Sequence, residues 1–206
     1  MADENPVAGD EPTLTEEFDE AGTLRRRLPM RAGALDGVME SFDALGRAEA
    51  RLSFVAGVLN GPAVTFLAGR PVLEMTYQDG VLEGEVRSYD PAGRLTAIVP
   101  FQAGRKNGTA MIYYPDGAPL RLETYEEDLL QGPVVDYHPG GIVRQEAIYS
   151  GGLLQGELVI YDPAGAEVER LRYEDGVQQS PAAPAAAMAP PARKPGLKER
   201  LFGKGG

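Results

Sequence analysis

The chain contains no cysteine and a single histidine, His138, among its 206 residues. The absence of cysteine excludes disulfides and thiolate chemistry. One histidine without cysteine supports neither a zinc site nor a Ser–His–Asp arrangement, and no Walker-type phosphate loop is present. Carboxylate pairs such as Glu167 and Glu169 fall on alternating strand positions, where solvation explains them. These absences predict a protein that is not an enzyme and that has no metal site and no cofactor.

Long hydrophobic runs are also missing. No apolar run approaches the roughly 18–20 residues that span a membrane. The N-terminal stretch MADENPVAGDEPTLTEE is acidic and lacks the apolar core of a secretion signal, so we expect a cytoplasmic location. The formal net charge of −11 repels phosphate backbones and argues against nucleic acid as a partner. The same charge attracts and steers a basic protein partner.

A repeat unit of about 24 residues organises most of the chain. The pentapeptide YDPAG occurs at Tyr89–Gly93 and again at Tyr161–Gly165, and the two copies lie three units apart. The units start at Gly33, Gly57, Gly80, Gly104, Asp128, Gly152 and Gly176, and the step from Gly57 to Gly80 is one residue shorter than the others. A second glycine follows four residues after each of the first six starts, at Gly37, Gly61, Gly84, Gly108, Gly132 and Gly156.

Aromatic residues recur at two fixed positions of every unit. The first set lies nine residues after the unit start: Phe42, Phe66, Tyr89, Tyr113, Tyr137 and Tyr161, with Phe18 at the same place in a half unit before them. The second set lies eleven or twelve residues further on: Phe54, Tyr77, Phe101, Tyr125, Tyr149 and Tyr173. An apolar residue also follows six residues after each start: Met39, Ala63, Val86, Ala110, Val134 and Leu158. This register predicts a structural aromatic ladder, in which rings on neighbouring hairpins stack in rows across a sheet.

Each unit predicts two strands joined by short turns. Segments such as GEVRSY (Gly84–Tyr89) and RLTAIVPF (Arg94–Phe101) are typical strands, and DPAG, YPDG and HPGG are typical turns between them. His138 replaces the aspartate of this turn and is predicted to be a turn residue. Glycine or proline interrupts the pattern about every ten residues, which leaves no window for a stable helix. The predicted fold is all-β: an elongated antiparallel meander, a single-sheet repeat array of about thirteen strands, with disordered tails.

The repeats resemble those of a known family. Gly-x-x-x-Gly, as in GRKNG (Gly104–Gly108), with a later aromatic residue and turn, as in YYPDG (Tyr113–Gly117), resembles the MORN repeat. The pattern is more similar still to the variant repeats of bacterial YwqK-type proteins, the antitoxins of toxin–antitoxin systems. This resemblance covers about residues 18–178. It implies a β-repeat protein that acts as an antitoxin or immunity protein and neutralises a toxin or effector.

Two departures from the family pattern concern lipid binding, which the resemblance also implies. Asp128 replaces a unit-start glycine, and Gly84-Glu85 is followed by an apolar residue where MORN repeats often carry Gly-x-Gly. Together with the acidic charge, these departures argue against a lipid-binding array.

Composition divides the chain into four segments. Residues 1–17 are acidic and predicted to be disordered, and residues 18–178 form the array. Residues 179–195 are an Ala/Pro-rich linker, and residues 196–206 form a short basic amphipathic peptide. Its candidate partner contacts are Leu197, Lys198, Arg200, Leu201 and Phe202.

Two functions stay open at this stage. The first is a non-enzymatic protein-binding scaffold, an antitoxin or immunity protein whose partner is a basic toxin or effector. The alternative is a structural or membrane-peripheral scaffold or adaptor that uses the C-terminal peptide, which is the only part of the chain expected to contact a membrane.

Overall fold

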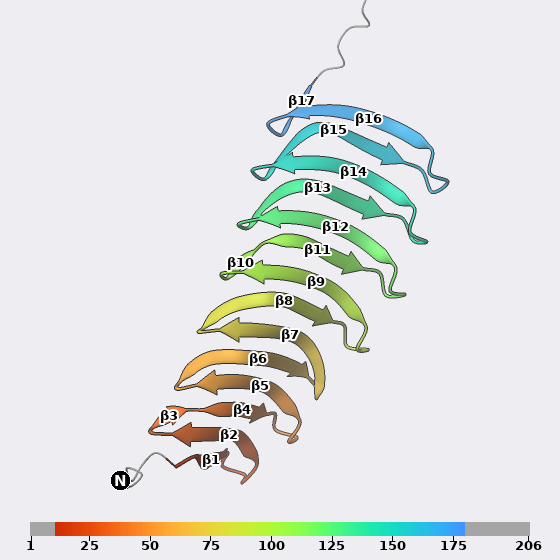
Figure 1. The fold of residues 1–206 in the computed structure, drawn as a ribbon. Helices are drawn as coiled ribbons and strands as arrows, with labels where there is room; N and C mark the ends of the chain where they lie inside the picture. Colours follow the sequence, from red (N-terminus) through yellow and green to blue (C-terminus); the bar gives the residue numbers. More distant parts are fainter. Residues whose placement is uncertain (1–10, 180–206) are drawn as a thin grey trace, which may run out of the picture.

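The computed structural model describes residues 11–179. They form one antiparallel sheet in which strands pair with their neighbours along the chain (Figure 1). Figure 1 shows a single layer whose strands bend in the same sense, and in the part drawn in colour no other element covers either face. The predicted all-β antiparallel meander is confirmed. The first ten residues, the linker beyond Gln179 and the peptide 196–206 lie outside the described residues.

The strands follow one another at regular intervals. They are β1 (Thr13–Phe18), β2 (Leu24–Arg31), β3 (Ala34–Leu35), β4 (Gly37–Phe42), β5 (Ala48–Val55), β6 (Val58–Leu67), β7 (Arg70–Gln78), β8 (Val81–Tyr89), β9 (Leu95–Gln102), β10 (Arg105–Lys106), β11 (Gly108–Tyr113), β12 (Pro119–Glu126), β13 (Leu129–Tyr137), β14 (Val143–Ser150), β15 (Leu153–Tyr161), β16 (Glu167–Glu174) and β17 (Val177–Gln179).

The predicted count of about thirteen strands is too low. The sheet has fifteen strand positions, of which two, β3–β4 and β10–β11, are interrupted once. The additional strands lie at the two ends, because β17 begins a seventh unit and β1 begins at Thr13, before the predicted start of the array at Phe18. The repeat pattern does not predict β1, because Thr13 occupies the position of the second glycine. Glu16 and Glu17 nevertheless form ion pairs with two arginines of β2, which hold this acidic stretch in the sheet.

Two-residue turns join each unit to the next, and both residues of the turn have positive φ. Ala56 and Gly57 are typical, with φ of 46° and 82°. Two positive φ values define a type I′ turn, whose twist matches that of the flanking strands. Asp128 is the exception to the glycine at the second place, with φ of 70°. Its Oδ1 accepts a hydrogen bond of 2.8 Å from the backbone N–H of Lys106.

The second glycine of each unit lies opposite the second-set aromatic residue of the same unit. Gly61, for example, pairs with Tyr77. Gly61 has φ of 105°, and a Cβ atom there would lie 3.2 Å from the Cβ of Ser53 on the neighbouring strand. The backbone conformation and the close approach both require glycine at this position.

We expect Gly61→Ala to lower the free energy of unfolding by about 2 kcal/mol, because it combines left-handed strain with a steric contact. Gly84→Ala is the matched control. Gly84 also has positive φ, 81°, but a Cβ atom there would meet no neighbouring atom within 4 Å, so strain alone costs about 1 kcal/mol. Denaturant unfolding of both variants measures the difference, and equal losses would show that the contact with Ser53 has no effect.

Alternation of side chains along the strands gives the sheet two faces. We call face I the side that carries Glu40 and Leu122, and face II the side that carries Ala63 and Ala110. The apolar residues that follow six positions after each unit start belong to face II. Only five apolar residues of the described chain are buried, and four of them lie on face II: Ala63, Ala110, Val134 and Ala147, with Val159 on face I. Each strand is therefore stabilised mainly by its immediate neighbours.

The two aromatic sets lie on opposite faces, the first on face I and the second on face II. Successive rings of one set are two strands apart, about 10 Å, which exceeds the distance of ring stacking. The intervening strand instead places another side chain beside each ring. The guanidinium carbon of Arg51 lies 5.5 Å from the ring centre of Phe66, and the Tyr89 hydroxyl donates a 2.7 Å hydrogen bond to Glu74. Contacts of this kind replace the predicted stacks of rings.

Candidate partner-binding face

The central row of face I changes its chemical character along the sheet. Successive members of this row are opposite one another on adjacent strands. From β1 to β16 the row contains Glu16, Arg27, Glu40, Arg51, Val64, Glu74, Arg87, Ile98, Met111, Leu122, Val135, Glu146, Val159 and Arg170. Acids and bases alternate at its N-terminal end, and four consecutive apolar residues occupy its middle.

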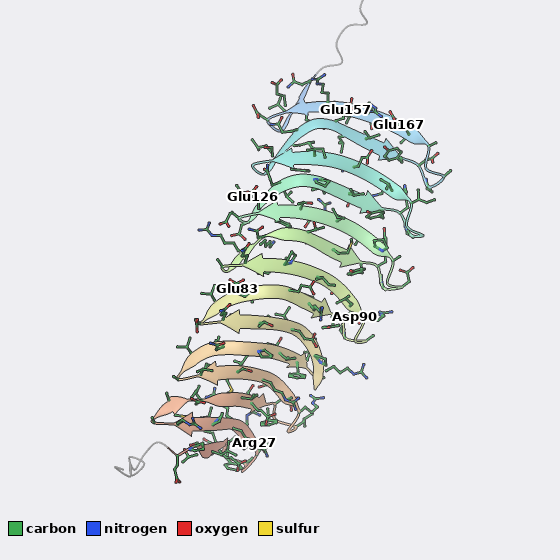
Figure 2. The ribbon with its side chains drawn as sticks, in the orientation of Figure 1. Arg27, Glu83, Asp90, Glu126, Glu157 and Glu167 are labelled. Atoms are coloured by element: carbon green, nitrogen blue, oxygen red, sulfur yellow. The ribbon has the colours of Figure 1, made fainter. Side chains whose placement is uncertain are left out.

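Ion pairs within the chain satisfy the N-terminal part of the row. Arg27 Nε lies 3.0 Å from the Glu16 carboxylate, and Arg51 Nε lies 2.9 Å from that of Glu40. Arg27, near the N-terminal end of the sheet in Figure 2, also has its guanidinium carbon 5.6 Å from the ring centre of Phe42. The ion pairs and this cation–π contact satisfy these charged groups within the chain.

The middle of the row is apolar, and no other element of residues 11–179 covers it. Ile98, Met111, Leu122 and Val135 are each half-buried. We call these four residues the apolar stretch. Removing their remaining apolar surface from water is favourable by roughly 25 cal/mol per Å², so this part of face I favours contact with another molecule.

A groove of about 400 Å³ extends the apolar stretch across β13 to β16. Pro133, Ile148 and Val159 line it beside Val135, and Ile148 is 50% exposed. Its exposed residues Pro133 and Ile148 therefore offer further apolar surface that a partner can bury.

Charged side chains also line this groove, and Glu146 lies between Val135 and Val159 in the row. Glu146 accepts a hydrogen bond from the Tyr161 hydroxyl, and Arg170 pairs with Glu157. Glu157 lies towards the C-terminal end of the sheet in Figure 2. The groove therefore combines apolar and charged side chains, as protein interfaces do.

Face II carries charge directly behind the apolar stretch. Glu123 takes the place that other units give to uncharged residues: Leu52, Met75, Val99, Ala147 and Leu171. Arg121 lies opposite Asp136 on the adjacent strand, with Nη1 3.2 Å from Oδ1, and its Nε is 2.7 Å from the Glu123 carboxylate. Arg144 approaches the other oxygen of Asp136 at 3.4 Å. The Asp136 side chain is only 6% exposed, and two guanidinium groups compensate its buried charge.

Tyr125 borders this charged cluster. Its hydroxyl donates a 2.7 Å hydrogen bond to Glu123, and Lys106 Nζ lies 4.9 Å from its ring centre. Burial, together with the hydrogen bond to the Glu123 carboxylate, raises the pKa of Tyr125 from 10.0 to about 12.

We expect this shift to make stability fall at alkaline pH. Because the pKa of Tyr125 is higher in the folded chain than in the unfolded chain, its contribution is complete below pH 10.0 and is lost as the pH rises through about 12. In an ultraviolet titration of tyrosinate, Tyr125→Phe should lack a step near pH 12. The control Tyr173→Phe, at the equivalent place of another unit, should retain that step. A Tyr125→Phe curve that keeps it would contradict the assignment.

His138 lies in a turn, where the sequence predicts it. The equivalent Asp90 accepts hydrogen bonds at Oδ1 from the backbone N–H groups of Arg94 and Ala92. Hydrogen bonding from Arg94 is the main reason that the pKa of Asp90 lies below its usual value. His138 instead extends to the next unit, where its Nε2 lies 2.9 Å from the carbonyl oxygen of Tyr161.

Sequence reasoning did not identify the apolar stretch or the cluster around Asp136. The available signal is a comparison of the units position by position, in which Leu122 falls in a column of mostly charged residues and Glu123 interrupts a column of uncharged ones. The predicted contacts of the C-terminal peptide, from Leu197 to Phe202, lie outside the described residues.

Comparisons with known proteins do not show a family for this chain. Within residues 11–179, no group of three or more His, Cys, Asp or Glu side chains could hold a metal ion. The same residues include no helix of the length and hydropathy that crossing a membrane requires. No protein-family model and no curated protein matches the chain.

Proposed function

We propose that this protein is a non-enzymatic binding scaffold that holds a partner protein on face I between β9 and β15. The reversed polarity of Leu122 and Glu123 in β12 carries the proposal. Leu122 is apolar at a position where four of the other five full units carry charge, and Glu123, its neighbour in sequence, is charged where they do not. Since the fold accepts charge at the position of Leu122 in the other units, folding does not require an apolar residue there. Binding of a partner accounts for it.

The charge of the array favours a basic partner. Residues 11–179 contain 27 acidic and 15 basic side chains, a net charge of −12. Ten of these basic side chains form ion pairs within the chain: Arg26, Arg27, Arg47, Arg51, Arg87, Arg94, Arg105, Arg121, Arg144 and Arg170. The excess acidic groups include Glu83 and Glu126, which lie along one lateral edge of the sheet (Figure 2). Such a field accelerates encounter with a positively charged protein.

The antitoxin or immunity role is the specific form of this proposal that the family resemblance supports. In that form the partner is a basic toxin or effector, and the contact on face I blocks its activity. The coarser proposal, a scaffold for a protein partner, does not depend on the resemblance.

Affinity capture from the native host, followed by mass spectrometry, tests the proposed function. The full-length chain should recover one basic protein in stoichiometric amount. Leu122→Glu should lose this protein, and Val64→Glu should retain it. Both substitutions introduce glutamate into the central row of face I, but Val64 lies in the part with ion pairs, between Arg51 and Glu74. Equal recovery by the two variants would place the contact elsewhere on the molecule.

A further inference from the structure

The two end strands of the sheet, β1 and β17, each correspond to a different part of the first strand of a repeat unit. The first strand of a unit, such as β8, extends from one to nine residues after the unit start. Within the described residues, which stop at Gln179, β17 covers the first three of these positions. β1 covers the last six, because its pairing with β2 repeats that of β4 with β5: Phe18 lies opposite Leu24, as Phe42 lies opposite Ala48.

Both ends of the sheet have unpaired edges within the described chain. β17 pairs with Arg172–Glu174 of β16, and no other residue of the described range 11–179 pairs with the segment from Glu167 to Leu171 on that side. In β14, Gln145, Glu146 and Ala147, which are equivalent to Glu169, Arg170 and Leu171, pair on both sides. At the other end, β2 is the only strand of residues 11–179 that pairs with β1, and all six residues of β1 are exposed. The free N–H and C=O groups of such edges favour the addition of another strand.

We infer that β1 of one molecule pairs with β16 of a second copy of this chain, in the register of the repeat. β17 and the incoming β1 then complete one first strand, and no residue of β16 has to pair twice on the same edge. The fold already accepts an interruption at this place. β10 ends two residues after its unit start at Gly104, and β11 resumes two residues later, at Gly108.

The side chains at this junction fit the repeat. In β14 and β15, Glu146 lies opposite Val159 and Ala147 opposite Leu158. The same register places Arg170 opposite Glu16 of the incoming strand, which extends the row of alternating charge on face I. It also places Glu169 opposite Glu17, and this pair of like charges opposes association.

The contact is head-to-tail, because the two edges that meet are different. A head-to-tail contact that does not close into a ring produces open chains of molecules. The net negative charge of each copy opposes this growth, so added salt should strengthen association by screening the repulsion. The inference concerns the edges of the sheet and is independent of the partner proposed for face I.

Sedimentation velocity of the full-length chain over a range of concentrations tests the inference. Glu169→Arg should lower the dissociation constant about tenfold, because it converts like charges into an attractive pair at the junction. Glu174→Arg is the matched control, since it makes the same change of charge in the part of β16 that β17 covers. Adding Glu17→Arg to Glu169→Arg should reverse the gain.

Each alternative result would overturn the head-to-tail pairing. Equal effects of Glu169→Arg and Glu174→Arg would attribute association to net charge alone. A chain that stays monomeric in every variant, or a dimer that does not grow with concentration, would exclude open assembly through these edges. A Glu17→Arg substitution that leaves the gain unchanged would exclude the proposed register.

Discussion

Replacing Leu122 with glutamate should weaken binding of the purified partner at least about 100-fold, a loss of about 2.7 kcal/mol. Leu122 lies in the centre of the apolar stretch, between Met111 and Val135 in the row. A carboxylate there loses its hydration when a partner covers it, and no basic side chain of the row lies directly opposite to compensate its charge. The loss should therefore appear mainly as faster dissociation.

The same substitution should leave the fold nearly unchanged. Glu74 and Glu146 already occupy the equivalent position in two other units, so the sheet accepts a glutamate there. We expect unfolding free energies of Leu122→Glu and Val64→Glu within about 1 kcal/mol of the parent chain. Isothermal titration and denaturant unfolding of both variants separate binding from stability. Loss of binding by Val64→Glu, or a large loss of stability in Leu122→Glu, would contradict this account.

Asp136→Ala should lower the free energy of unfolding by about 2 kcal/mol, because it breaks a buried ionic network. The carboxylate of Asp136 is buried between Arg121 and Arg144, and its removal leaves two guanidinium groups without their partner. A fully buried pair would cost about 3–5 kcal/mol to break. The Arg121 side chain is 33% exposed and that of Arg144 is 49% exposed, so contact with water reduces the effect.

A combined variant tests whether this cluster stabilises the sheet at all. Arg121→Leu, Glu123→Val and Asp136→Ile together install residues that Leu73, Val99 and Ile160 carry at the equivalent positions. Because well-packed apolar residues often equal or exceed a buried ionic network in stability, we expect this triple variant to be at least as stable as the parent chain. A loss of stability as large as that of Asp136→Ala would show that the network itself is required.

Much of the fold could be predicted from the sequence because glycine has few substitutes at positive φ. The turn at Ala56–Gly57 and the crowded backbone at Gly61 both select it, and their recurrence reveals the length of the unit. The glycine pattern does not predict β1, because Thr13 occupies the position of the second glycine. Its strand is held by backbone pairing and by ion pairs of Glu16 and Glu17, which leave no periodic signal.

The candidate site could not be predicted from a single unit. Arg121 and Asp136 belong to different strands, whose pairing shifts at a bulge between Glu123 and Tyr125. Only the register of β12 against β13 brings the two side chains together. The apolar stretch likewise takes its four residues from four different strands, so it exists as a surface only when adjacent strands are aligned.

Methyl NMR of the full-length chain, with and without the captured partner, tests the proposed binding face most directly. The methyl signals of Met111, Leu122 and Val135 on face I should shift or broaden when the partner is added, and those of Met39 and Leu52 on face II should stay unchanged. Shifts confined to Met39 and Leu52, with Leu122 unaffected, would contradict the account.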